Sequence, residues 1–411
     1  MGVPNWEGRT SKAENRCPSE TINMATKKLN WYEFFAGGGM ARLGLGPQWN
    51  CTFANEWSEK KASAYRAYFG KSPELKVQDI RHLKTDDLPG HPDLVWASFP
   101  CQDLSLAGSG AGLRGERSGT FRPFWKLIDG LISENRKPRI VVLENVAGTI
   151  TSHKGNDFTT IIRTIAESGY VVGALVIDAL HFVPQSRPRL FIIAASSEGR
   201  IPPGLTLQNH SLLWHPRSLL KAYFDWPLSL RKNWIWWNLL EPGDLQVQRL
   251  SSIIEQDPSG VSWHSKEETL RLVALMSETN RKKLRLVQSE ATRRIGTIYK
   301  RTRPISKSPR AKRVQRAEVR FDEVSGCLRT PVGGSSRQTI LVVEGKRLAS
   351  RLLAPREAAR LMGVLEDYPL PEKYNDAYHL FGDGVVVPVV SWLERNLLRP
   401  LAGRKALEQV A

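Results

Sequence analysis

The chain has only four cysteines among its 411 residues, at positions 17, 51, 101 and 327, and no two of them stand in a Cys-x-x-Cys spacing. This scarcity argues against a disulfide framework and against a metal site. No apolar run reaches the ~18 residues of a membrane-spanning helix, and no signal peptide is recognisable. We therefore expect a protein of the cytoplasm that binds neither a membrane nor a metal.

Acidic residues are also under-represented: 41 Asp and Glu stand against 59 Lys and Arg, which gives a net charge of +18. The excess is concentrated in residues 281–320, where fifteen residues are Lys or Arg and two are acidic. Charged runs are usually solvated surface, but apolar residues are interspersed in this one. Its density favours phosphate contacts and a nucleic-acid partner.

Polar clusters stand at the ends of three apolar runs that we expect to be strands. Pro100-Cys101-Gln102 closes the run 93–99, and the other clusters are Glu144-Asn145-Val146 and Gln185-Ser-Arg187-Pro-Arg189. Proline stops a strand, and open α/β sheets bind ligands at the carboxyl ends of their strands. A lone cysteine at a strand end is usually inert core. Together, however, the clusters propose a nucleophile, an acid and an anion-binding arginine pair.

A glycine turn, Phe35-Ala36-Gly37-Gly38-Gly39, follows the first expected strand and precedes a helix. Glycines let the backbone approach a ligand closely, and a helix amino end offers unpaired N–H groups. Glu56-Trp57 and Asp79-Ile80 end the next two strands. These acidic residues are either partners of ribose hydroxyls or solvated caps. The turn alone would also suit a nicotinamide-dependent oxidoreductase, which would leave Cys101 and the basic block unexplained.

In chain order, these elements resemble the motifs of the bacterial-type DNA cytosine-5 methyltransferase family. The resemblance continues in residues 351–363 and 382–385, and it covers about residues 29–200 and 320–395. It implies an α/β, Rossmann-like domain that uses S-adenosylmethionine, with a mostly parallel sheet, plus a smaller target-recognition domain. The chain departs from the family pattern at Glu33, where aspartate is usual, and at Asp383, where asparagine is frequent.

The resemblance also implies a domain plan. Residues 1–23 are expected to be a disordered extension, 24–200 the catalytic and cofactor-binding domain, 201–375 the target-recognition domain, and 376–411 a segment that returns to the catalytic domain. Tryptophans crowd the third region, and we expect them to form its core rather than to stack on bases. They are at positions 214, 226, 234, 236, 237 and 263.

The chemistry explains why the family needs these residue types. Carbon 5 of cytosine is a poor nucleophile, so the Cys101 thiolate must first add to carbon 6. A protonated Glu144 can hydrogen-bond ring nitrogen 3, and a closed, dry pocket would raise its pKa as required. A base inside a duplex cannot reach Cys101, so the cytosine must be flipped out, and the glycine-rich residues 103–122 are expected to close over it.

The resemblance assigns site residues in three groups. The catalytic residues are Cys101, Glu144, Arg187 and Arg189. The residues expected to bind the cofactor S-adenosylmethionine are Phe35, Ala36, Gly37, Gly39, Glu56, Trp57, Asp79, Ile80, Pro100, Asp383 and Val385. Those expected to bind DNA are Gln102, Ser105, Asn145, Gln185, Arg329, Thr330 and Arg337.

The predicted function is sequence-specific methylation of duplex DNA, in restriction-modification or epigenetic marking, by a monomer in the bacterial cytosol or nucleoid, with a phage as the alternative source. Methylation of cytosine in RNA on the same fold is the alternative within the enzyme class, and the large basic insert favours DNA. A catalytically silent DNA-binding protein is the alternative from another class. The presence of Cys101, Glu144 and Arg187 argues against it.

Overall fold

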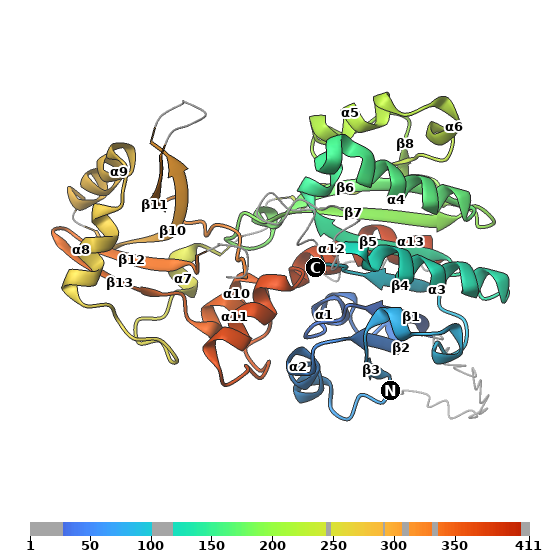
Figure 1. Cartoon of the computed structure of the whole chain (residues 1–411), viewed down its shortest axis with the longest axis horizontal. Helices are drawn as coiled ribbons and strands as arrows, with labels where there is room; N and C mark the ends of the chain where they lie inside the picture. Colours follow the sequence, from blue (N-terminus) through green and yellow to red (C-terminus); the bar gives the residue numbers. More distant parts are fainter. Residues whose placement is uncertain are drawn as a thin grey trace, which may run out of the picture.

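The apolar runs of the first 200 residues form one seven-stranded sheet, with the strand order β3-β2-β1-β4-β5-β7-β6 (Figure 1). β7 is antiparallel to both of its neighbours, whereas the other pairs are parallel. The predicted mostly parallel α/β sheet is therefore confirmed. The strands are β1 (Leu29–Phe34), β2 (Trp49–Glu56), β3 (Leu75–Val77), β4 (Leu94–Ala97), β5 (Ile140–Val146), β6 (Tyr170–Asp178) and β7 (Pro188–Ser196).

This computed structural model describes residues 28–100, 118–243, 248–290, 292–305, 312–330 and 336–403. The expected disordered extension 1–23 lies outside these ranges. No helix in the described ranges is long and apolar enough to span a membrane.

Helices cover both faces of the large sheet, which is why its strands read as continuous apolar runs. One face packs on α3 (Phe121–Ser133) and α4 (Asn156–Glu167), whose buried residues join those of the sheet in one hydrophobic cluster. The other face packs on α1 (Met40–Leu45) and α12 (Val387–Leu393). α2 (Glu59–Phe69) follows β2 and packs on the β2–β3 side.

The C-terminal helices return to the first strands of the large sheet. Trp49 Nε1 donates to Glu394 Oε1 at 2.9 Å, and Ser391 Oγ donates to the Gly44 carbonyl at 2.9 Å. Gly44 permits this approach, because a Cβ there would lie 2.4 Å from Val390. The chain thus closes on the side of the sheet that carries α1, through α10 (Pro355–Leu361), α11 (Tyr374–Asp383), α12 and α13 (Arg399–Leu401).

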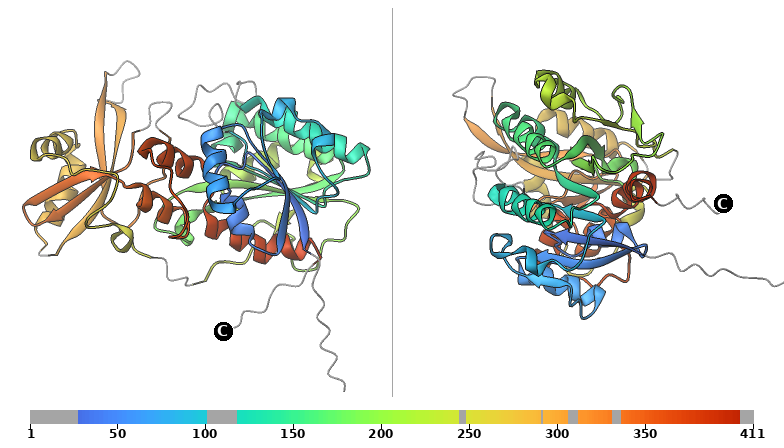
Figure 2. Two further views of the ribbon diagram at one scale, coloured as in Figure 1. Left: turned by 90° about the horizontal axis from the view of Figure 1, so that it is seen from below. Right: turned by 90° about the vertical axis from the view of Figure 1, so that its right-hand side faces the viewer.

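A second, antiparallel sheet with the order β11-β10-β12-β13 forms a smaller domain at the other end of the molecule, and α10 and α11 lie between the two sheets (Figures 1 and 2). Its core is a separate cluster that includes Ile298, Leu341 and Leu284. The elements are α7 (Leu250–Ile253), α8 (Lys266–Ala274), α9 (Glu278–Gln288), β10 (Arg294–Pro304), β11 (Arg313–Arg320), β12 (Thr339–Glu344) and β13 (Arg347–Leu352).

Residues 201–240 differ from the expected domain plan, because they pack on the large sheet and not in the smaller domain. The Ile235 amide donates to the Val172 carbonyl at 2.9 Å, and Trp237 Nε1 donates to the Ile193 carbonyl at 3.0 Å. The tryptophan-rich segment covers β6, a strand edge that would otherwise be open. Its elements are β8 (Thr206–Leu207), α5 (Arg217–Asp225), α6 (Leu228–Arg231) and β9 (Trp236–Trp237).

A fully buried ion pair joins β13 to α10, where the small domain meets the rest of the chain. The two guanidinium Nη atoms of Arg351 donate to both carboxylate oxygens of Glu357 at 2.8 and 2.6 Å. The same carboxylate accepts from the backbone amides of Ala354 and Glu255, each at 2.8 Å. The pair therefore holds three segments together.

We expect Glu357→Ala to destabilise the protein by about 3–5 kcal/mol, because it leaves the Arg351 charge buried without its partner. Urea unfolding monitored by circular dichroism measures the change. Glu278→Ala is the matched control: it removes the exposed partner of Arg285, and solvent screens that pair, so the free energy of unfolding should change little. Equal losses in the two variants would contradict a special role for the buried pair.

Candidate active site

The turn after β1 has the backbone geometry that its glycines predicted. Phe35, Gly37 and Gly39 have φ angles of +59°, +56° and +78°, a region in which glycine alone pays no steric cost. Ala36 is buried behind the turn. The Gly37 amide donates to Glu56 Oε2 at 2.8 Å, so the acidic end of β2 holds the turn in place.

Glu56 is buried, and its other carboxylate oxygen accepts from the amides of Trp57 and Ser58 at 3.0 and 2.8 Å. A carboxylate offers about four lone-pair sites, so three backbone bonds leave one of them for a ligand. The Trp57 side chain is 62% exposed, although large aromatic side chains are usually buried. A fixed acid and an exposed indole thus lie side by side at the end of β2.

The acidic residue after β3 is held by its own neighbour. Asp79 accepts from the Arg81 backbone amide at 2.9 Å and from the Arg81 guanidinium at 2.7 to 3.2 Å, and these hydrogen bonds lower the pKa of Asp79. Ile80 is 4% exposed and packs in the core. It can therefore contribute only an apolar wall to a neighbouring site.

Glu33, which stands where the family usually has aspartate, is buried at the end of β1. Burial raises its pKa to about 8, although the charge of Arg42 acts in the opposite direction. The side chain is therefore mostly protonated at neutral pH. Its Oε2 atom is buried without a hydrogen-bond partner among the described residues.

Asp383 stands where the family frequently has asparagine, and a nearby cation compensates its negative charge. Its carboxylate pairs with Lys61 Nζ of α2 at 2.7 Å, which offsets the charge that replaces an amide. The neighbouring Val385 is 4% exposed. Gly384 packs on Met40, since a Cβ there would lie 2.3 Å from the Met40 sulfur. The expected cofactor residues of the last motif thus lie beside those of the first.

Glu144 lies at the carboxyl end of β5 and is 5% exposed. Burial raises its pKa, although nearby Arg189 and Arg187 oppose the shift and Ser98 gives a hydrogen bond. Arg189 Nε is 3.3 Å from Glu144 Oε1. The carboxyl group at the end of β5 is thus buried, and burial holds its pKa above the usual value.

Asn145 and Gln185 were expected to contact DNA, but the structure shows their side chains in hydrogen bonds within the protein. Asn145 Nδ2 donates to the Phe99 carbonyl at 3.1 Å, two residues before Cys101. Gln185 Nε2 donates to the Leu361 carbonyl at 2.7 Å, and its Oε1 accepts from the Leu328 amide at 2.9 Å. Asn145 therefore restrains the chain that leads to Cys101, and Gln185, which precedes β7, joins Leu361 of α10 to Leu328.

Arg187 also differs from the expectation that it grips the base or a phosphate. The side chain is 1% exposed. Its Nη1 donates to the Leu328 carbonyl at 2.8 Å, and its Nη2 donates to the carbonyls of Gly382 and Gly384 at 2.8 and 2.7 Å. Its Nε is buried without a partner among the described residues. Arg187 therefore ties β7 to the cofactor motif near the C-terminus, and Arg189 alone remains beside Glu144.

Cys327 was not singled out by sequence reasoning, because an isolated cysteine in a loop carries no pattern. Its sulfur lies 3.4 Å from Arg187 Nη1 and 3.9 Å from Arg189 Nη1 and Nη2. Burial alone would raise the pKa of this thiol, but Arg187, Arg189 and Arg329 outweigh burial and lower it. The contacts also confirm that Arg187 and Arg189 point to the same side.

The small domain contributes the remaining expected DNA residues. Arg329 is exposed, and the backbone of Thr330 packs against Gly382. An Arg337 Nη atom donates to the Asn375 side-chain oxygen. Part of the basic block is paired within the protein, as in the ion pairs of Arg301 and Arg303 with Glu318. The exposed cations that remain are fewer than the sequence count suggests.

Cys101, the expected nucleophile, lies outside the described ranges, together with Gln102, Ser105 and the expected lid up to residue 117. Pro100, the last described residue before it, is half-buried at the end of β4. No group of three or more His, Cys, Asp or Glu side chains that could hold a metal ion occurs in the described ranges.

Comparisons with known proteins agree with this geometry. The family model described as C-5 cytosine-specific DNA methylase matches residues 29–399. Type II methyltransferase M.Bsp6I from Bacillus sp. (strain RFL6) is 31% identical over 89% of this chain and 98% of its own length. Type II methyltransferase M.HhaI from Haemophilus parahaemolyticus is 26% identical over 90% of this chain and 94% of its own length.

Solved structures share the fold at low identity. The Entamoeba histolytica methyltransferase EhMeth has a TM-score of 0.59 at 15% identity and covers 91% of this chain and 99% of its own. S. pombe Dnmt2 methyltransferase has a TM-score of 0.54 at 17% identity, with the same coverage.

Proposed function

The chain belongs to the C-5 cytosine-specific DNA methylase family, and we propose that it methylates carbon 5 of a cytosine within a specific sequence of duplex DNA. One observation carries the proposal. Glu144, buried and paired with Arg189, lies at the same sheet edge as the end of β4 that leads to Cys101 and as the glycine turn after β1. A proton donor, a nucleophile and a cofactor pocket are needed together only for group transfer.

The family implies S-adenosylmethionine as cofactor, and the residues present fit it. Glu56 retains one acceptor site for a ribose hydroxyl, the exposed Trp57 offers an aromatic face to the adenine, and the turn 35–39 leaves room for the amino-acid part. Asp79 and Asp383 would flank this pocket. When bound, the cofactor supplies the methyl group.

On the substrate side, we propose that Cys101 forms a bond to carbon 6 of the flipped cytosine. A protonated Glu144 hydrogen-bonds ring nitrogen 3 and stabilises the charge that develops on attack. Carbon 5 then carries the negative character that methylation requires. Once carbon 5 carries the methyl group, a water molecule takes the proton from carbon 5. The electron pair left behind re-forms the double bond between carbons 5 and 6 and expels the Cys101 thiolate.

Arg189 and Asn145 position this machinery. Arg189 lies against Glu144, so it fixes the orientation of the carboxyl group, and its positive charge limits how far burial can raise the pKa. Asn145 anchors Phe99 and so restrains the start of the segment that carries Cys101. Arg187 contributes indirectly, because its hydrogen bonds hold the proposed cofactor residues near the C-terminus against the start of β7.

We further propose that the smaller domain selects the target sequence, with its base contacts in the DNA groove. In this proposal the exposed Arg329 makes one of these base contacts. The enzyme acts as a monomer in the bacterial cytosol or nucleoid.

Bisulfite sequencing of DNA from a bacterial host that expresses the protein tests the proposal. We expect one short sequence to become resistant to conversion at nearly every copy, whereas DNA from a host that expresses the Cys101→Ala variant should convert throughout. A side-by-side assay with purified protein on duplex DNA and transfer RNA completes the test. Methylation of the RNA without the duplex would overturn the DNA assignment.

A further inference from the structure

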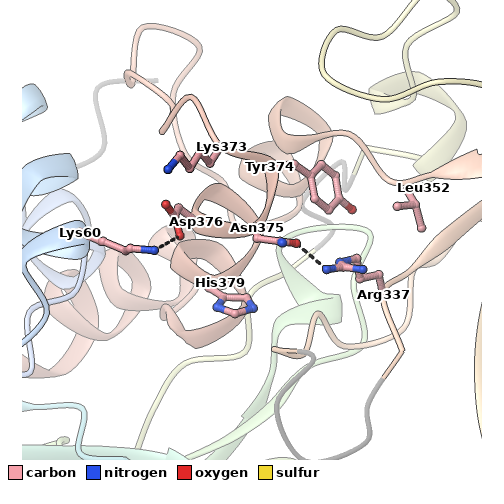
Figure 3. Close-up of a pocket in the computed structure, with 8 residues that line it drawn as sticks. All are labelled: Lys60, Arg337, Leu352, Lys373, Tyr374, Asn375, Asp376 and His379. Atoms are coloured by element: carbon pink, nitrogen blue, oxygen red, sulfur yellow. Dashed lines mark hydrogen bonds and ion pairs between the residues drawn. The ribbon is translucent and has the colours of Figure 1, made fainter.

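A cavity of about 690 Å³ lies where α2 of the large domain meets α11 (Figure 3). This volume is within the range of ordinary ligand pockets. Basic side chains from three parts of the chain line it: Lys60 on α2, Arg337 on the segment that enters β12, and Lys373 and His379 at the start and on the body of α11. None of these residues except Arg337 belongs to the site described above.

The charge in this cavity is not balanced. Asp376, its acidic lining residue, pairs with Lys60 Nζ at 2.9 Å and is thereby neutralised. The side chains of Lys373 and His379 form no ion pair or hydrogen bond with any residue in the described ranges, and Lys373 is exposed. The cavity therefore holds uncompensated positive charge and free donors.

Arg337 contributes a guanidinium group that has hydrogen-bond donors still available. One Nη atom donates to the Asn375 oxygen, and the guanidinium carbon lies 5.7 Å from the centre of the Tyr374 ring. These two contacts hold the side chain in one orientation, and the other Nη atom has no acceptor among the described residues. A pre-oriented guanidinium beside a flexible lysine suits an anion with several acceptor oxygens.

We propose that this cavity binds one backbone phosphate of the DNA duplex, through Lys373, Arg337 and His379; the proposal rests on the proposed function. Its residues come from both sides of the junction between the domains, so a strand that lies along this junction would contact both domains at once. Such a contact fixes the position of the duplex without reading its sequence. Lys60 and Asp376 form the wall that keeps α2 and α11 together around it.

The test measures duplex binding by fluorescence anisotropy over a range of salt concentrations, for the Lys373→Ala and Arg337→Gln variants. Each lost phosphate contact should reduce the slope of log affinity against log salt by ~0.9. The loss should be equal for a target duplex and an unrelated duplex. Lys373→Arg keeps the charge and should keep the slope. Lys232→Ala, after α6, removes an exposed lysine at a distant site and should also keep it.

Unchanged slopes in Lys373→Ala and Arg337→Gln, with melting temperatures like the wild type, would overturn the proposal. So would a loss of inorganic phosphate or pyrophosphate binding without a change in slope, since that outcome indicates a site for a small ligand. Binding slopes do not depend on turnover. Wild-type protein that binds duplex but never methylates it would therefore refute the proposed function and leave this test readable.

Discussion

Replacing Cys101 by alanine is expected to abolish methyl transfer and to leave S-adenosylmethionine affinity within a few-fold of the wild type. The reason is that carbon 5 of cytosine cannot accept the methyl group until a nucleophile has added to carbon 6. Apart from Pro100, the residues proposed to bind the cofactor lie on other strand ends, around Glu56 and Gly37, so the loss of the sulfur should change cofactor affinity little. A radiolabelled-methyl assay and equilibrium dialysis measure the two quantities.

Cys51→Ala is the matched control, because it removes a thiol that cannot act as a nucleophile. Cys51 lies on β2, and burial raises its pKa to about 12, so the thiolate form is negligible at neutral pH. This variant should retain turnover. Methyl transfer by the Cys101 variant at a rate close to that of the control would show that another residue attacks the base.

Glu144→Gln is expected to slow the chemical step by on the order of 10²-fold or more, the usual size of an acid-base contribution. The amide has nearly the same shape, but it cannot give up a proton to ring nitrogen 3. Single-turnover kinetics with saturating DNA and cofactor isolate this step from binding. Glu278→Gln, on the exposed surface of α9, should leave the rate unchanged.

The same assignment predicts the direction of the pH dependence. Burial raises the pKa of Glu144, so its protonated, hydrogen-bonding form persists to higher pH than in an exposed glutamate. The single-turnover rate of the wild type should therefore fall as the pH rises through this pKa, unless thiolate formation at Cys101 compensates. In Glu144→Gln this falling limb should disappear. A near-wild-type rate in the variant would sink the role given to Glu144.

The sequence by itself determined the parts of this protein that depend on local pattern. Continuous apolar runs closed by polar residues predicted the parallel strands and the edge at which the site forms, because a strand buried on both faces must be apolar along its length. Glycines at 37 and 39 predicted a turn with positive φ angles. The order of the motifs was sufficient for the family, since each motif is a short run of consecutive residues.

The tertiary structure alone decided what each polar side chain contacts. Arginines 187 and 189 look equivalent in the sequence, but Arg187 meets carbonyls of Leu328, Gly382 and Gly384, which are distant in the chain, whereas Arg189 meets Glu144. Hydrogen bonds between residues almost 200 positions apart leave no local trace. The same reason applies to Asp383, whose compensating Lys61 lies on α2, 322 positions earlier in the chain.

Tertiary packing also decided where the tryptophan-rich segment belongs. Its composition predicted a buried core, and Trp214, Trp226, Trp234, Trp236 and Trp237 are buried. Trp263, which was predicted with them, is 41% exposed. Composition does not say which surface an apolar segment covers, because the hydrophobic effect is non-directional. The open edge of β6 provided that surface, so residues 201–240 pack on the large domain. The residues alone thus predicted that this segment is buried. Which surface it packs on depended on the sheet that the rest of the chain forms.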